Sequence, residues 1–396
     1  MWNDDIAYAM AFSKFFTLPL GGWPLQEFNT FTLIRFIMSF CITFSLIITS
    51  FINAYYMQIN IHCGNMYGKI DALMIGFCCI PAVVKHSMFR IYAENMTRNY
   101  SSAISDYCAI DTKEKRTVMR QHAFLGRMIF YFVVAVAFTT SVGLIMTPVI
   151  EYSNNGQVNA STNKPIAKYP VPSDCTWGQL DVSTGMYLLL FVVQCIQITI
   201  GSSAYVGNDS LFLTITLHVC GQMELLGIEF RKFAVETKNI KMDLLKLTTR
   251  HCYLLSHAQQ LADAISVILL TQLFCSSILI CIIGFQFILA LKVVDVVMII
   301  KASIALITFL SQLFAYSVVG EYLKSQTEEI AYSIYCSNWH CLSSKFMKNI
   351  LFIIVRSQQP VTFMAGRYLV VNLQTYMSIL ETSFQYLSIL RMMVET

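Results

Sequence analysis

Seven stretches of mostly apolar residues recur along the chain, each long enough for a membrane-spanning helix. A helix needs about 20 such residues to cross the hydrocarbon core of a bilayer. Pro81 interrupts the second stretch, which a membrane helix tolerates because its neighbours satisfy the freed carbonyl group. The seventh stretch is the most polar. The pattern predicts an all-α membrane protein with seven transmembrane helices, over residues 31–57, 70–88, 127–150, 183–206, 264–290, 296–319 and 369–392.

Two segments between these stretches also have a helical pattern. Residues 211–263 and 321–358 contain few Pro or Gly, and their apolar residues recur at helical spacing. They predict cytoplasmic helices that extend the fourth, fifth and sixth spans, with a further short helix over 342–357. These helices either pack on each other within one subunit or form the contact between subunits.

The composition is also typical of a membrane protein. Of the 396 residues, 56% are hydrophobic and 13% are charged, whereas a soluble domain carries about 25% charged residues. The net charge of +4 is spread along the chain, which argues against nucleic-acid binding, because that function needs a clustered basic face. The sequence has no Walker, HExxH or GxSxG motif and no metal-ligand spacing. We therefore expect no enzyme activity, cofactor or metal.

Lysine and arginine are concentrated in alternate loops, and this sets the predicted orientation. Cytoplasmic loops hold the excess of these residues. Loops 89–126 and 207–263 contain six each and loop 320–368 contains five, whereas the intervening loops contain one or two. The topology is therefore inverted relative to that of G-protein-coupled receptors, with the N-terminus cytoplasmic and the C-terminus extracellular.

This orientation has two consequences for the outer loops. The sequon at Asn159 lies outside and can be glycosylated, whereas the sequons at Asn95 and Asn99 lie inside and are expected to stay bare. Cys63 and Cys175 both face the oxidising exterior, where they can pair in a disulfide.

The seventh apolar stretch carries the most informative polar pattern. A helix that faces lipid would not keep Asn, Gln, Thr, Ser and Glu, because each unsatisfied polar group in hydrocarbon costs several kcal/mol. Two interpretations stay open: a hydrogen-bonded packing face inside the bundle, or the wall of a water-filled pore to which each subunit contributes once. In the second, an apolar ring at Ile389 gates the pore by excluding water. The pore and gate candidates are Ser378, Thr382, Gln385, Ile389, Met392 and Met393.

A binding site for a small molecule is expected to be an apolar pocket with a few polar groups. Met and aromatic residues adapt to small volatile molecules, and the outer halves of spans two, three, four and six contain such residues beside polar ones. Ordinary packing of the bundle accounts for any one of them equally well. The ligand-binding candidates are Met74, Phe77, Thr139, Thr140, Gly143, Tyr187, Gln194, Lys301 and Ile304.

A few ionisable residues lie within or beside the predicted spans. Arg35 and Lys85 are near cytoplasmic ends, so we expect their side chains to extend to the lipid headgroups. Asp209 follows the fourth span and is expected to cap the helix that continues from it. Lys301 is a functional candidate because it lies inside the sixth span, although extension toward the outer surface explains it almost as well.

Several short motifs lie together in the last quarter of the chain. They are Tyr335-Cys336-Ser337-Asn338-Trp339, Arg356-Ser357-Gln358-Gln359-Pro360, Ala365-Gly366 and the run from Tyr376 to Arg391. Together they resemble the C-terminal signature of insect odorant receptors, in the style of the hymenopteran members.

This resemblance implies a function. Members of that family are subunits of tetrameric, odour-gated, non-selective cation channels that assemble with a common co-receptor in the plasma membrane of olfactory sensory neurons. The final helix lines the pore, with Ile389 at the hydrophobic gate and Gln385, Met392 and Met393 beside it. The cytoplasmic helices join the subunits, and a small volatile odorant or pheromone binds in the outer half of the bundle. The chain lacks the longer cytoplasmic loop of the co-receptor, so it resembles a tuning subunit.

The expected organisation is a single seven-helix domain over 1–396, in which 1–320 form the ligand-binding bundle and 321–396 the anchor helix and pore-lining helix. Three other classes stay open. A gustatory receptor-type channel has a similar architecture but responds to tastants and does not depend on the co-receptor. A G-protein-coupled receptor requires the opposite orientation. A transporter is expected to show internal repeats, which the sequence does not display.

Overall fold

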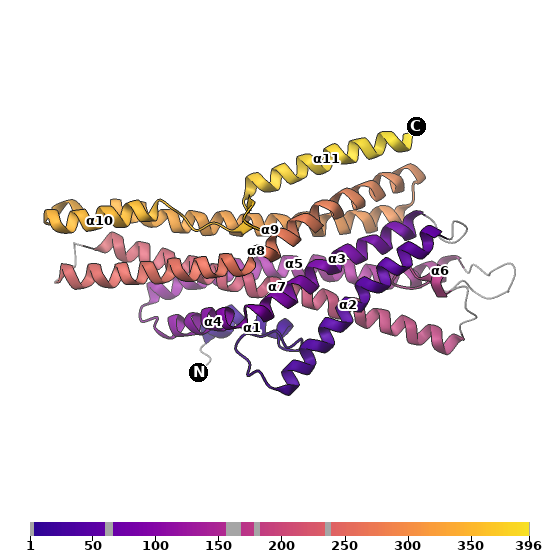
Figure 1. Cartoon of the computed structure of the whole chain (residues 1–396), viewed down its shortest axis with the longest axis horizontal. Helices are drawn as coiled ribbons and strands as arrows, with labels where there is room; N and C mark the ends of the chain where they lie inside the picture. The colour runs from indigo at the N-terminus through magenta and orange to yellow at the C-terminus, as the bar shows by residue number, and fades with distance from the viewer. Residues whose placement is uncertain (1–3, 60–65, 156–167, 178–182, 234–238, 396) are drawn as a thin grey trace.

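The computed structural model describes residues 4–59, 66–155, 168–177, 183–233 and 239–395, which form an elongated bundle of helices (Figure 1). The elements are α1 (Asp4–Thr17), α2 (Thr30–Ile59), α3 (Met66–Ile91), α4 (Ala93–Cys108), α5 (Lys113–Asn155), α6 (Asp174–Trp177), α7 (Thr184–Lys232), α8 (Ile240–Val293), α9 (Val296–Tyr335), the 3₁₀ turn η1 (Trp339–Cys341), α10 (Ser344–Ser357), β1 (Met364–Ala365), β2 (Leu369–Val370) and α11 (Leu373–Glu395).

The chain is an α-helical membrane protein. Within the described ranges, six helices are long and apolar enough to cross a bilayer, and they match the first six predicted spans: α2, α3, α5, α7, α8 and α9. The seventh predicted span corresponds to α11. Its 23 residues are about 34 Å long at about 1.5 Å per residue, which suffices for a hydrocarbon core of about 30 Å. Because α11 is more polar than the other six, the seventh crossing and the orientation stay predictions.

Four helices continue far beyond the length that a membrane requires: α5 has 43 residues, and the other three are the helices whose extensions the sequence predicts. α7, α8 and α9 have 49, 54 and 40 residues, and their extensions reach the end of the molecule where α10 lies (Figure 1). α10 confirms the short helix expected at 342–357. It packs on α9 and buries Ile350 and Ile354, while Phe352 and Val355 stay exposed. The extensions thus pack on each other within one chain and still leave an apolar face uncovered.

The apolar pattern does not predict α1 and α4, because neither is long or apolar enough to stand out. α1 packs on α7, where the Ser13 hydroxyl donates to the carbonyl oxygen of Ser210 at 3.1 Å. At its N-terminal end, the Asp5 carboxylate lies 2.6 Å from the guanidinium of Arg116 in α5. These contacts hold the start of the chain against α5 and α7 in the half of the bundle that is predicted to be cytoplasmic.

A short antiparallel hairpin departs from the all-helical prediction. β1 pairs with β2, and Gly366 and Arg367 in the turn have φ values of 58° and 65°. The Gly366 N–H donates to the carbonyl oxygen of Ser266 in α8 at 3.0 Å. The hairpin therefore anchors the start of the last helix on the bundle, and that helix begins at Leu373 rather than at the predicted residue 369.

Gly320 of α9 lies so close to the segment before α11 that a Cβ there would overlap the backbone carbonyl oxygen of Val371. Since a backbone atom cannot rotate away, we expect Gly320→Ala to lower the free energy of unfolding by about 1–3 kcal/mol, as overpacking does. The thermal unfolding midpoint of the purified protein in detergent measures this. Gly185→Ala is the matched control, because a Cβ there meets nothing within 4 Å. Equal midpoints for the two variants would contradict the close approach.

Candidate ligand cavity and candidate pore helix

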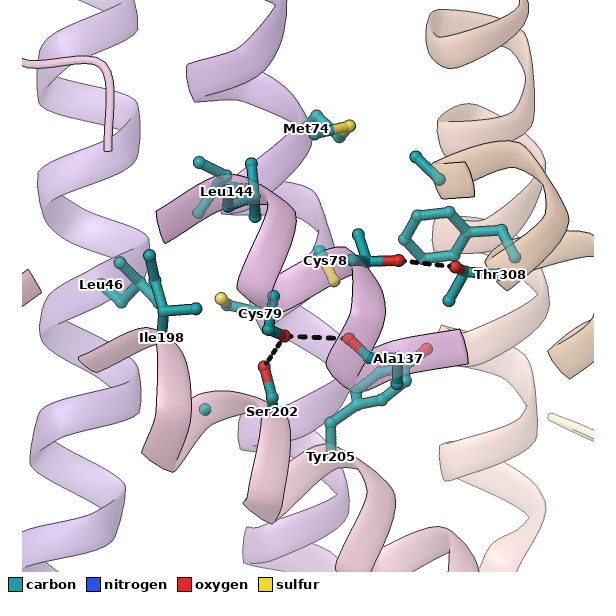
Figure 2. A pocket seen from close by; sticks show the side chains of 16 residues that line it. Leu46, Met74, Cys78, Cys79, Ala137, Leu144, Ile198, Ser202, Tyr205 and Thr308 are labelled. Atoms are coloured by element: carbon teal, nitrogen blue, oxygen red, sulfur yellow. Dashed lines mark hydrogen bonds between the residues drawn. The ribbon is translucent and has the colours of Figure 1, made fainter. Parts of the chain in front are cut away.

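An apolar cavity of about 90 Å³ lies among α2, α3, α5, α7 and α9 (Figure 2). This is several times the roughly 10–15 Å³ that one water molecule requires. Small residues on three of the helices, Ala137, Gly201 and Ala305, leave the space open. The described wall residues include no charged side chain. The rest of the wall consists of Leu46, Met74, Ile75, Cys78, Cys79, Thr140, Ser141, Leu144, Ile198, Ser202, Tyr205, Thr308 and Phe309.

Two pairs of hydroxyl groups are the main polar feature of this wall. Thr140 and Thr308 share a hydrogen bond of 2.8 Å between α5 and α9, and Ser141 and Ser202 share one of 2.7 Å between α5 and α7. A ligand hydroxyl or carbonyl group can hydrogen-bond here by replacing one member of a pair. The cavity therefore suits a small uncharged molecule with one polar group, since a charged ligand would lose its hydration without gaining a counter-ion.

The structure places two of the nine ligand-binding candidates, Met74 and Thr140, on the cavity wall. Gln194 is buried at a different place, where its side chain accepts from the Val171 N–H at 3.0 Å and donates to the Ser173 hydroxyl at 3.1 Å. The other six also lie away from this wall. Thr139 and Gly143 are exposed on α5, and Ile304 is half-buried elsewhere on α9. Phe77 packs edge-on against Phe51, Tyr187 donates to the Lys168 carbonyl oxygen, and Lys301 pairs with Asp71.

A buried ion pair close to the cavity corrects two expectations. Lys85 of α3 is 0% exposed, and its ammonium lies 2.5 Å from the Asp209 carboxylate of α7, so it does not extend to the headgroups. Asp209 lies in the interior of α7 and caps no helix. The Arg35 guanidinium bonds to the protein itself, because it donates to the carbonyl oxygen of Leu18 at 2.8 Å. The partner of Lys85 comes from a distant part of the chain, so the position of Lys85 within its span does not reveal the ion pair.

A second ion pair joins three helices at the predicted outer end of the bundle. Lys301 of α9 pairs with Asp71 of α3, and Gln286 of α8 donates to the same carboxylate at 2.8 Å. This cluster accounts for a lysine inside the sixth span. Cys175 is disulfide-bonded, whereas Cys63, the proposed partner, lies outside the described residues, as does Asn159.

Below the predicted membrane region, one carboxylate holds three helices together. Asp106 of α4 accepts from Arg250 of α8 at 2.7 Å and lies 3.1 Å from a ring nitrogen of His218 in α7. Burial alone would raise the pKa of Asp106, but His218 and Arg250 outweigh it and hold the pKa below its ordinary value. The aspartate therefore stays charged and fixes α4 on α7 and α8.

α11 lies at the edge of the bundle beside α8 and α9 (Figure 1). One face rests on the bundle: Ser383 is buried, and Leu387 packs on Gly284 of α8. The pore and gate candidates, called the polar stripe below although its outer end is apolar, lie on other faces, so the described helices of this chain do not pack on them. The exposed members of the stripe are Ser378, Thr382, Gln385, Ile389 and Met392, and the side chain of Met393 lies outside the description.

Comparison with known proteins agrees with this architecture. The family model for the 7tm odorant receptors matches residues 65–384. Odorant receptor 10 of Aedes albopictus is 25% identical over 213 residues, which are 52% of this chain and 55% of that protein. Odorant receptor 13a of Drosophila melanogaster is 32% identical over 201 residues, which are 46% of this chain and 48% of that protein. The chain thus spans about half the length of the curated relatives it matches.

The fold is also that of a solved structure. The insect olfactory receptor OR5 from Machilis hrabei, in complex with eugenol, superimposes with a TM-score of 0.80 at 13% identity and covers 99% of this chain and 100% of that one. The bundle and its cavity define a multi-pass helical membrane receptor. Because the family model matches most of its length, the chain belongs to the 7tm odorant receptor family.

The position of α11 generates a test by chemical labelling. We expect a charged, membrane-impermeant methanethiosulfonate reagent to label the thiol introduced by Thr382→Cys, because Thr382 is exposed on the polar stripe. Ser383→Cys is the matched control and should stay unlabelled, since Ser383 is 4% exposed. Mass spectrometry of the α11 peptide measures the labelling. A thiol at position 382 that stays sealed, with and without an agonist, would show that the stripe does not meet water.

Proposed function

We propose that this chain is an odorant-binding subunit of an odour-gated, non-selective cation channel. The observation that carries the proposal is the polar face of α11, which the other described helices of the chain leave uncovered. In hydrocarbon such a face needs water or a partner. Several copies of α11 around a symmetry axis would meet both needs by enclosing an aqueous path. Ile389, which is 50% exposed, would then form the apolar gate.

Membership of the odorant receptor family supports the remaining parts of this proposal. The chain would assemble with a common co-receptor into a heterotetramer in the plasma membrane of olfactory sensory neurons. The exposed apolar face of α10, with Phe352 and Val355, offers a surface for the contact between subunits. Residues 1–320 would bind the ligand and 321–396 would supply the anchor and pore helices. Because α9 crosses this boundary, the two parts differ in function and do not form separate bodies.

The ligand class follows from the cavity. Its apolar wall and paired hydroxyl groups favour a small, volatile, uncharged molecule with one hydrogen-bonding group. The structurally similar olfactory receptor of Machilis hrabei was solved in complex with eugenol, which supports ligands of this general kind. A gustatory receptor-type channel is the second candidate, and the family match favours the odorant receptor.

Recording from cells tests the function. Cells that express this chain with an odorant-receptor co-receptor should carry cation currents in response to members of a panel of C6–C10 alcohols, ketones, aldehydes and esters. Ser202→Leu fills the cavity, so we expect it to raise the half-maximal concentration by roughly tenfold or more at equal surface expression. Ser203→Leu is the matched control, because Ser203 does not line the cavity. Silence across the panel despite surface expression would overturn the proposal, and currents without the co-receptor would favour the gustatory type.

Glycan mapping tests the orientation. Asn159 should carry sugar, whereas Asn95 and Asn99 should not. The Asn99 side chain is 3% exposed and hydrogen-bonded to His257, so the folded chain leaves no room for a glycan there. Digestion with a glycosidase followed by peptide mass spectrometry locates the modified asparagine. A glycan on Asn95 would show that the orientation is the reverse of the predicted one. Asn159→Gln is the control: it should abolish the shift in gel mobility that glycosidase digestion causes in the unmodified sequence.

A further inference from the structure

The ion pair of Lys85 and Asp209 is surrounded by aromatic rings and an amide from α7 and α9. The Lys85 ammonium lies 3.9 Å from the ring centroid of Tyr205 and 5.4 Å from that of Tyr316. The Asp209 carboxylate accepts hydrogen bonds from the Tyr316 hydroxyl and, at 2.6 Å, from the Gln312 amide. The pair thus connects α3 and α7 to α9.

Tyr205 belongs to this cluster and to the cavity wall at the same time. Its ring lines the cavity, as Figure 2 shows, and also lies against the Lys85 ammonium. Its hydroxyl accepts a hydrogen bond of 2.9 Å from the Gln272 amide of α8 and donates to the Gln312 side chain of α9 at 2.5 Å. A molecule in the cavity therefore cannot shift this ring without changing the surroundings of the ion pair.

The two helices reached through Tyr205 are the ones that hold α11. Gly284 of α8, three turns after Gln272, packs on Leu387, and the Cys281 thiol contacts the carbonyl oxygen of Ser383. On α9, Phe314 follows Gln312 by two residues and packs edge-on against Tyr376 at 5.6 Å between ring centroids. A continuous set of contacts thus runs from the cavity wall to α11.

The energetics argue that this pair does more than hold the bundle together. Removing two charges from water costs several kcal/mol per ion, and a buried pair often stabilises a fold no better than apolar residues of similar size. Removing one partner alone is strongly destabilising, because it leaves an unpaired buried charge. A pair of this kind permits few arrangements, so displacement of one member changes the positions of the others.

We propose that Tyr205 and the Lys85–Asp209 pair are positioning residues that couple occupancy of the cavity to the placement of α11. Tyr205 senses the ligand through its ring, and Gln272 and Gln312 pass the displacement to α8 and α9. This inference rests on the proposed function, because it assigns a route between the ligand and the pore. It differs from that proposal in naming residues that neither line the pore nor, apart from Tyr205, contact the cavity.

Tyr205→Phe is the sharpest variant, because it keeps the ring on the cavity wall and removes only the hydroxyl. Without any ligand, hydrogen–deuterium exchange of the purified chain should become roughly fivefold faster or more in α11 and in the neighbouring turns of α8 and α9. Tyr100→Phe is the matched control: Tyr100 is buried too, but its hydroxyl donates to the Leu211 carbonyl oxygen of α7 and not to the Gln272 or Gln312 side chains that Tyr205 contacts. Unchanged exchange in α11 for Tyr205→Phe would overturn the coupling.

The ion pair is tested by the double variant Lys85→Met/Asp209→Asn, which removes both charges and so avoids an unpaired one. With the most effective member of the C6–C10 panel as the probe, we expect normal surface expression and a maximal current reduced roughly fivefold or more. Ligand-induced thermal stabilisation should persist, which separates binding from gating. Lys85→Arg keeps the pair and should restore the current.

Wild-type maximal currents in the double variant would show that the pair is only structural. If no panel member opens the wild-type channel, the proposed function fails, and the exchange measurement still decides the coupling.

Discussion

The absence of water from the bilayer core is the constraint on which this structure depends. Backbone groups meet it by forming helices, and buried polar side chains meet it by pairing across helices. Lys85 forms an ion pair with Asp209, and Lys301 forms one with Asp71. Each pair joins α3 to a helix much later in the chain, so the pairs fix how the early and late halves of the bundle face each other. The exposed polar side chains of α11, such as Ser378, Thr382 and Gln385, are the exception, since the described helices of this chain do not cover them. For that helix, the same constraint requires water or another subunit.

Helix positions could be predicted well from the sequence because they depend on local composition. Six spans lie where the apolar stretches indicate, and the extensions of α7, α8 and α9 follow from uninterrupted helical periodicity. The features that the sequence does not reveal depend on contacts between distant segments. α1 is held by Asp5 and Ser13 through partners more than a hundred residues away. The hairpin before α11 needs only a few residues, and its position depends on the carbonyl oxygen of Ser266.

The residues that line the cavity are even harder to predict from the sequence, because they also depend on contacts between distant segments. Sequence reasoning selects large adaptable residues such as Met74 and Phe77, and only the first lies on the wall. The space itself exists because Ala137, Gly201 and Ala305 face one another on three helices. Small residues are frequent along the chain, and which of them meet depends on helix rotation and crossing, which a single sequence does not encode in any readable pattern. The polar stripe of α11 was easier to identify, because periodicity within one helix is enough to define a face.

The candidate ligand cavity and the candidate pore helix lie apart in the bundle. None of the described wall residues belongs to α11, so a ligand in the cavity would act on α11 through the helices that lie between them. α9 meets this requirement within a few turns: Thr308 and Phe309 lie on the cavity wall, and Phe314 packs on Tyr376 of α11. α8 does not line the cavity and reaches it through Gln272, which bonds to Tyr205. Since packed helices move as units and interiors are not continuously deformable, the proposed coupling requires only a small shift at the cavity wall to change the packing of α11. In the proposed channel, the long helices would therefore let a small molecule in the cavity act on the polar face of α11 without touching it.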